Sequence, residues 1–167
     1  MSLRERLLNR PRPSGEFPLR VEDDTAARDE LERARRLLTL LLVQGGAEAA
    51  ALEQARADVR EAEGKLRACF AFVTLRALPA TDFEALVAAH KPRPETKDQM
   101  FNLDTFPRAC FLACVEGDLT PQEWEHLWET GMSNAEQVEA GNAAIRVNIR
   151  TPDESLPKGW ARTEPSS

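Results

Sequence analysis

The chain has 167 residues and a formal net charge of −6 at pH 7, with 42% hydrophobic and 30% charged residues. This length fits one domain with tails, or one domain with an appended helical hairpin. The negative charge argues against nucleic acid as a partner, because phosphate contacts need a basic surface. No apolar run approaches the roughly 18 to 20 residues of a membrane span, so a membrane is not an expected partner either.

Residues 1–15 are rich in arginine and contain Pro11, Pro13 and Gly15, which prevent a helix from continuing through this segment. They are interpreted as a flexible basic arm that either binds a partner or stays solvated, as unanchored chain ends commonly do. Residues 17–21 alternate between apolar and polar side chains, which predicts a short strand. Pro18 would confine that strand to a sheet edge.

A helical hairpin is predicted between residues 24 and 66. Apolar residues recur every three or four positions from 26 to 44 and again from 47 to 66, and Gly45-Gly46 separates the two runs. Charged residues occupy the outer positions of both runs. Two helices of similar length joined by a short glycine turn are typical of an antiparallel hairpin.

The apolar stripe of this hairpin is wider than two helices need to cover one another. The excess comes from Leu37, Leu40, Leu41 and Val43, which crowd near the glycine turn. A wide apolar face near an exposed tip is typical of an interaction surface. The alternative is that helices from the C-terminal half fold over it. We predict these four residues, together with Trp160, as the partner-binding residues.

Residues 68–78 are dense in aromatic and β-branched side chains, which predicts a second strand that pairs with residues 17–21. Residues 16–78 therefore form a predicted strand, helical hairpin and strand. The predicted fold class is mainly α: a long helical hairpin followed by a compact bundle of short helices, with a small two-stranded β element.

Residues 79–149 are predicted to form the C-terminal helical bundle. Capping boxes mark helix starts at Thr81, Thr120 and Ser133, each with an acidic residue three positions later. Trp124 and Trp128 share one face of the helix that starts at Thr120, so they are predicted to lie in the core.

A further buried helix is predicted after Asp104 or Thr105, either of which would cap it. Its Cys110 and Cys114 are predicted to be buried small hydrophobes. A zinc site would need four ligands, usually with closely spaced cysteine or histidine pairs, and none occurs. A Cys–His nucleophile pair with His126 is formally available, but an apolar helix disfavours a thiolate.

No phosphate-binding loop, Walker pattern or serine elbow is present. We predict no catalytic, cofactor-binding or metal-binding residues, no cofactor and no enzymatic activity. Three cysteines without a secretion signal indicate reduced thiols in a cytoplasm. Residues 150–167 have the composition of a disordered tail, in which Trp160 is a lone aromatic residue of the kind that often serves as a docking anchor.

Three motifs lie in order between residues 70 and 148. A strand ending in Arg-Ala-Leu-Pro at 76–79 precedes a helix that finishes in His-x-Pro at 90–92. Phe-Asn-x-Asp-Thr-Phe-Pro occupies 101–107. Leu-Thr-x-x-Glu-Trp-x-x-Leu-Trp occupies 119–128 and is followed by a helix that starts at a serine. With these motifs the chain resembles the tail assembly chaperones of long-tailed actinobacterial phages.

The resemblance implies a non-enzymatic protein that acts in the host cytoplasm while the phage tail is built. Such proteins are thought to escort the long helical tape-measure protein until tail-tube subunits assemble around it. The implied partners are the tape-measure protein or other tail proteins, and a homo-oligomer is also compatible. Many members are made in a short and a frameshifted longer form, and the polar end Glu-Pro-Ser-Ser would match a short form.

Two other functions stay open from the sequence. One is a structural virion component of the tail or neck, whose ends become ordered against neighbouring subunits. The other is a generic helical adaptor of the bacterial host. The neighbouring DNA discriminates between them, because a slippery heptamer near the end of the gene, directly before a very long helical gene, would select the chaperone.

Overall fold

The computed structural model describes residues 1–46 and 48–150. Most of these residues lie in helices, so the prediction of a mainly helical fold is confirmed. Trp160 and the rest of the tail beyond Arg150 lie outside the described residues. The described elements, in chain order, are α1 (Leu3–Leu8), β1 (Ser14–Arg20), α2 (Thr25–Gln44), α3 (Ala49–Ala68), β2 (Phe70–Arg76), α4 (Ala80–Ala89), α5 (Phe106–Cys114), β3 (Val115–Glu116), α6 (Pro121–His126), the π-helical turn η1 (Leu127–Gly131) and α7 (Asn134–Ile149).

The chain divides into two units. The first takes Met1–Phe17 and the chain from Thr74 onward, and the second takes Pro18–Val73. Among the described residues, no helix combines the length and the apolar character needed to cross a membrane.

The sheet has three strands in the order β1-β2-β3, which corrects the predicted two-stranded element. The third strand, β3, consists of only two residues, and Val115 and Glu116 pair antiparallel with Leu75 and Thr74 of β2. Two residues carry no alternating pattern, so no periodic signal marks a strand of this length. The long-range pairing with β2 alone defines it.

Strand β1 lies at the edge of the sheet, as Pro18 predicts, because a residue without an N–H is tolerated there. Backbone hydrogen bonds mark both ends of its pairing with β2. The amide of Val21 donates to the carbonyl of Cys69 at 2.9 Å, and the amide of Ala77 donates to the carbonyl of Pro13 at 2.8 Å. The strand begins at Ser14, three residues earlier than its alternating pattern predicts.

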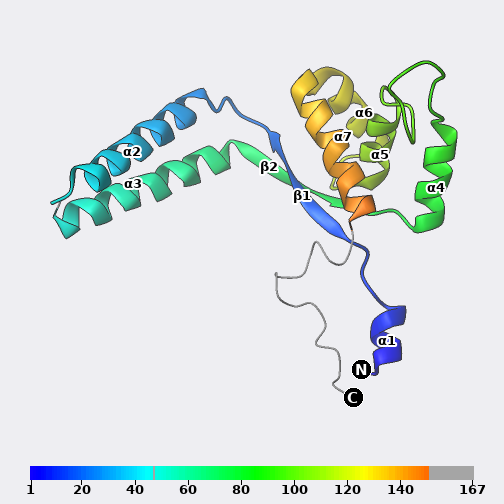
Figure 1. The fold of residues 1–167 in the computed structure, drawn as a ribbon, viewed down its shortest axis with the longest axis horizontal. Helices are drawn as coiled ribbons and strands as arrows, with labels where there is room; N and C mark the ends of the chain where they lie inside the picture. The colour runs from blue at the N-terminus through cyan, green and yellow to red at the C-terminus, as the bar shows by residue number, and fades with distance from the viewer. Residues whose placement is uncertain (47, 151–167) are drawn as a thin grey trace. The chain divides into compact units, whose positions relative to one another are not determined.

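In the second unit, α2 and α3 lie side by side (Figure 1). The contact uses small side chains on α3, where Ala55 and Ala62 are almost fully buried, and Leu31 on α2. Alanine at the contact lets two helix backbones approach closely, so the short apolar stripe of α3 suffices for packing. Asp24, directly before α2, is also buried, and the hydrogen bond from the Arg28 side chain holds the pKa of its carboxyl below the usual value.

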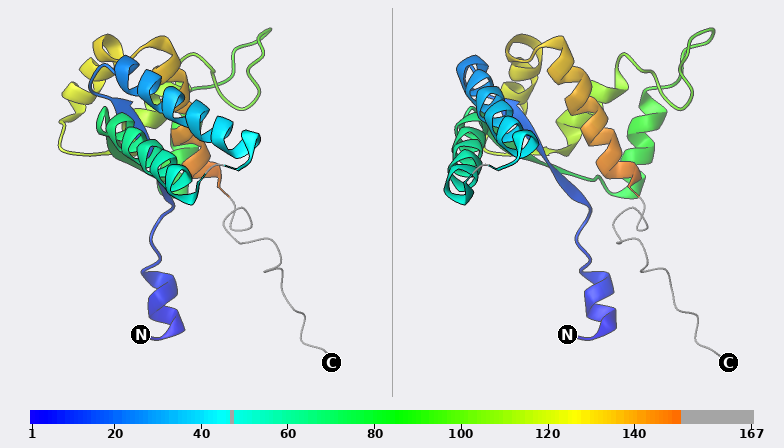
Figure 2. Two further views of the ribbon diagram at one scale, coloured as in Figure 1. Left: turned by 90° about the vertical axis from the view of Figure 1, so that its left-hand side faces the viewer. Right: turned by 60° about the vertical axis from the view of Figure 1, so that its left-hand side comes forward.

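In the first unit, α5 packs against α7 (Figure 2), with α4 and α6 also in contact with α5. Phe106, Cys110 and Phe111 of α5 are fully buried, and the ring of Phe111 contacts two indoles. Its centroid is 6.1 Å from the Trp124 ring and 5.2 Å from the Trp128 ring. The prediction that both tryptophans belong to the core is confirmed.

Two of the predicted capping boxes are present. The Thr120 hydroxyl accepts a hydrogen bond from the amide of Glu123, and the Ser133 hydroxyl accepts one from the amide of Glu136. The predicted box at Thr81 is wrong, because α4 begins at Ala80 and Pro79 stands at its N-cap. The N-cap therefore lies two residues earlier than predicted, and the fixed φ of a proline is compatible with a helix start.

The start and exposure of α5 also differ from expectation. Thr105 is its N-cap residue but makes no capping bond, because its hydroxyl lies 2.8 Å from Nδ1 of His90 instead. Ala113 is exposed, so α5 is buried on most sides rather than nearly all round. At the N-terminus, residues 3–8 of the predicted basic arm form α1, which Ser2 and Glu5 close with a capping box that the sequence analysis did not identify.

Candidate interaction surface

The last two turns of α2 expose a cluster of apolar side chains. Residues 37–46 contain no charged residue. We call residues 37–44 the tip segment. The exposed fractions of its side chains are 48% for Leu37, 55% for Leu40, 55% for Leu42 and 79% for Val43. Singly exposed leucines are ordinary, but Leu37, Leu40 and Val43 recur every three residues and share one face of α2, which is typical of a binding surface. Leu42 lies about 160° from Leu40 around the helix.

The predicted partner-binding residues differ in their exposure to solvent. Leu37, Leu40 and Val43 are exposed, whereas Leu41 is half-buried and Leu38 lies with it toward α3. Leu42 is exposed although the sequence analysis did not select it. Almost every residue from 37 to 43 is apolar, so the sequence shows no helical period there. Only the position of α3 determines which leucines are half-buried and which are exposed. Trp160 lies outside the described residues.

Two ion pairs join α2 to α3, both in the half of these helices that is farther from the tip segment. The Glu30 carboxylate lies 2.7 Å from the Lys65 ammonium, and the Arg35 guanidinium lies 2.8 Å from the Glu63 carboxylate. Within the described residues, no ion pair joins the two helices beyond Arg35. The described part of the tip segment is therefore not held to α3 by an ion pair.

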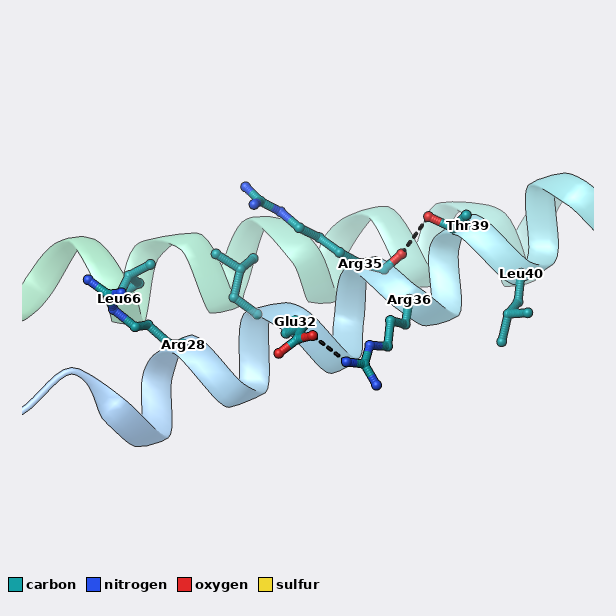
Figure 3. A pocket seen from close by; sticks show the side chains of 8 residues that line it. Arg28, Glu32, Arg35, Arg36, Thr39, Leu40 and Leu66 are labelled. Carbon is teal, nitrogen blue, oxygen red and sulfur yellow. Dashed lines mark hydrogen bonds and ion pairs between the residues drawn. The ribbon is translucent and has the colours of Figure 1, made fainter.

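A groove runs along one side of α2, and Figure 3 shows its lining. Leu31 and Leu66 contribute the apolar floor, and Leu40 of the tip segment lies at one end. Arg36 pairs with Glu32 along the rim (Figure 3). A second hollow shares Leu31, Arg35 and Leu66 and continues toward the strands, where it is lined by Pro18, Glu63, Arg67, Phe70 and Phe72.

Arg67 supplies a cation at that end of the groove. Its guanidinium carbon lies 4.0 Å from the centroid of the Phe72 ring, within the range of a cation–π contact. Phe72 remains 39% exposed beneath it. The groove thus combines an apolar floor with arginine-rich edges, a composition suited to protein contact rather than to catalysis.

The two cysteines of α5 form a buried polar cluster with Asn148 of α7. The Asn148 amide nitrogen lies 3.1 Å from the Cys114 sulfur and donates to the Ala144 carbonyl at 2.8 Å. Its amide oxygen accepts a hydrogen bond from the Leu78 backbone amide at 2.8 Å. The cluster joins α5, α7 and the segment after β2 through one side chain.

The two thiols lie close enough to affect the pKa of Cys110. The neighbouring Cys114 thiol, together with burial, raises the pKa of Cys110, so this thiol stays protonated. His126 is not a partner of either thiol, since its imidazole lies against the Thr130 hydroxyl at 3.3 Å. The structure therefore does not bring together the Cys–His pair that the sequence left formally open.

We expect the double substitution Cys110→Ala with Cys114→Ala to lower the free energy of unfolding by about 1–3 kcal/mol, because it removes two small buried groups and the weak hydrogen bonds from Asn148 to the two sulfurs. Asn148 keeps its bonds to Leu78 and Ala144, so the fold is retained. Chemical denaturation monitored by circular dichroism measures the loss. Stoichiometric zinc in the purified wild-type protein that disappears from the double variant would contradict this structural role.

Residues 91–105 form an ordered loop held by Arg93. The guanidinium Nε of Arg93 donates to the Asp98 carboxylate at 2.9 Å, and the backbone amide of Arg93 donates to it at 3.0 Å. The bond from the Arg93 side chain, with further backbone bonds, holds the pKa of Asp98 far below its usual range. Met100 and Leu103 are exposed on this loop.

Within residues 1–46 and 48–150, no group of three or more His, Cys, Asp or Glu side chains is arranged to hold a metal ion. The cysteine cluster has only two thiols and the Asn148 amide.

A scan against protein-family models found no match to this chain, and searches of curated proteins and of solved structures found none either.

Proposed function

We propose that this protein is a non-enzymatic tail assembly chaperone of a long-tailed phage, which binds the helical tape-measure protein in the host cytoplasm during tail assembly. The resemblance of residues 70–148 to that family suggests the function. The observation that carries it in the structure is the tip segment, whose Leu37, Leu40, Leu42 and Val43 are exposed without a charged residue among them.

The proposed arrangement is a long helical hairpin, α2 with α3, followed by a compact bundle of short helices. In this arrangement the hairpin is the binding element. A long helical partner such as a tape-measure protein presents apolar stripes at a spacing of three and four residues, and the tip segment offers leucines at the same spacing. The bundle, with its buried tryptophans, is the stabilising element.

The double substitution Leu40→Glu with Val43→Glu tests the surface. Both side chains are exposed, so we expect the protein to stay folded and its melting temperature to change by no more than a few degrees. Two carboxylates on the apolar patch would have to be buried on binding, so retention of the tape-measure protein should fall at least about tenfold. Co-expression with the long helical gene next to this one, followed by affinity purification, measures retention.

The matched control is Val138→Glu, because Val138 is an exposed apolar residue of α7, 52% accessible, and lies outside the tip segment. It should retain the tape-measure protein as well as the wild type does. Undiminished retention by a folded Leu40→Glu, Val43→Glu protein would rule out the tip segment. Failure of the wild-type protein itself to retain any tail protein would count against the chaperone function and in favour of a virion component or a host adaptor.

A further inference from the structure

The two sides of the α2–α3 pair carry opposite excess charge. One side holds the groove of Figure 3, and we call it the basic flank. The groove and the hollow that continues it include four arginines against two glutamates. These are Arg28, Arg35, Arg36 and Arg67 against Glu32 and Glu63. Asp24, just outside the lining, pairs with Arg28, so the excess on this flank is one positive charge. Leu31 and Leu66 form the floor between them, and Leu40 of the tip segment lies at one end.

The other side, which we call the acidic flank, also holds a groove. Its lining includes three carboxylates, Glu30, Asp58 and Glu61, against Arg33. Lys65 lies beside it, 2.7 Å from Glu30 and 3.0 Å from Glu61, and neutralises part of that charge. Asp58 accepts a hydrogen bond from the Gln54 amide at 2.8 Å and has no cation within ion-pair distance among the described residues.

Helix geometry places the two flanks on opposite sides of the contact between α2 and α3. Successive residues of a helix are rotated by about 100°. On α2, Leu31 and Ala34 lie at the contact with α3. Arg35 lies on the basic flank, and Leu37 lies on the acidic flank. Each flank also offers an exposed leucine, Leu40 on the basic side and Leu37 on the acidic side.

We propose that this chain self-associates side by side, with the basic flank of one copy against the acidic flank of a second copy. The charges are complementary, and the apolar floors and exposed leucines of the two grooves meet in the same contact. Both flanks lie along the same two helices, α2 and α3. Because two different surfaces meet, the contact is heterologous, and each added copy presents a free flank to the next.

The self-association does not depend on the proposed chaperone function, because it needs only this chain. It predicts assemblies that grow with concentration beyond a dimer and weaken as salt is added, since exposed charges are screened. Analytical ultracentrifugation of the purified full-length chain at low and high ionic strength measures both properties.

Charge reversal of one flank at a time gives the decisive test. Arg36→Glu with Arg67→Glu makes the basic flank acidic, and Asp58→Lys with Glu61→Lys makes the acidic flank basic. None of these residues joins α2 to α3 by an ion pair, so both variants should keep the wild-type circular dichroism spectrum. Each variant alone carries two flanks of the same sign, so its association should weaken at least about tenfold.

An equimolar mixture of the two variants should associate again, because every flank of one variant is then complementary to a flank of the other. A two-fold symmetric contact through some other surface would not show this rescue. The proposal is overturned by a wild-type chain that stays monomeric up to about 1 mM, by variants that associate as the wild type does, or by a mixture that fails to recover. Arg33→Glu, which makes the acidic flank more acidic, is the matched control and should not weaken association.

Discussion

Truncation of Trp124 to alanine should cost about 3–5 kcal/mol of the free energy of unfolding, the usual range for removing a large buried aromatic side chain. The indole is 6% exposed and contacts the edge of Phe111 with ring centroids 6.1 Å apart. It also lies over Gly117, where an added Cβ would stand 3.0 Å from indole Cζ2. Because the site is closed on both sides, the surrounding residues have little room to collapse into the cavity.

A loss of this size approaches the whole stability of many domains. For a chain of this length it corresponds to a drop in melting temperature of roughly 10 °C, since each kcal/mol shifts the transition by about 2–4 °C. Differential scanning calorimetry measures it without relying on tryptophan fluorescence. Trp124→Phe, which keeps a ring against Phe111, should lose less than half as much. An unchanged melting temperature for Trp124→Ala would show that the indole is not part of the core.

Substitution of Gly141 by alanine should destabilise the protein by about 1–3 kcal/mol, the range for an overpacked core. Gly141 lies inside α7, where alanine is ordinarily better than glycine by about 1 kcal/mol. Here an added Cβ would stand 2.6 Å from the Pro107 Cβ and 3.3 Å from the Pro107 backbone. A proline ring and a backbone cannot rotate away, so α5 and α7 would have to separate.

Gly64→Ala is the matched control. Gly64 also lies inside a helix, α3, but nothing stands within 4 Å of an added Cβ there. This substitution should stabilise the protein by about 0.5–1 kcal/mol, because alanine loses less backbone entropy than glycine. Urea denaturation of both variants measures the opposite signs. Stabilisation by both would mean that α5 and α7 do not approach as closely as the structure places them.

The local features of this protein could be predicted from its sequence because each depends on residues within about four positions of one another. The period of apolar residues located α2 and α3, and the spacing of Thr120 and Ser133 from their glutamates located two helix starts. Pro18 marked an edge strand through its own missing N–H. The same period placed Trp124 and Trp128 in the core.

The tertiary structure alone decided the features that join residues far apart in the chain. Strand β3 exists because Val115 meets Leu75, and the bond of Asn148 to the Leu78 amide spans 70 positions. The division of Leu37–Val43 into buried and exposed side chains depends on where α3 lies, and the need for glycine at 141 depends on Pro107. A sequence pattern records the preference of each segment for helix or strand, but a contact between segments depends on the geometry of both.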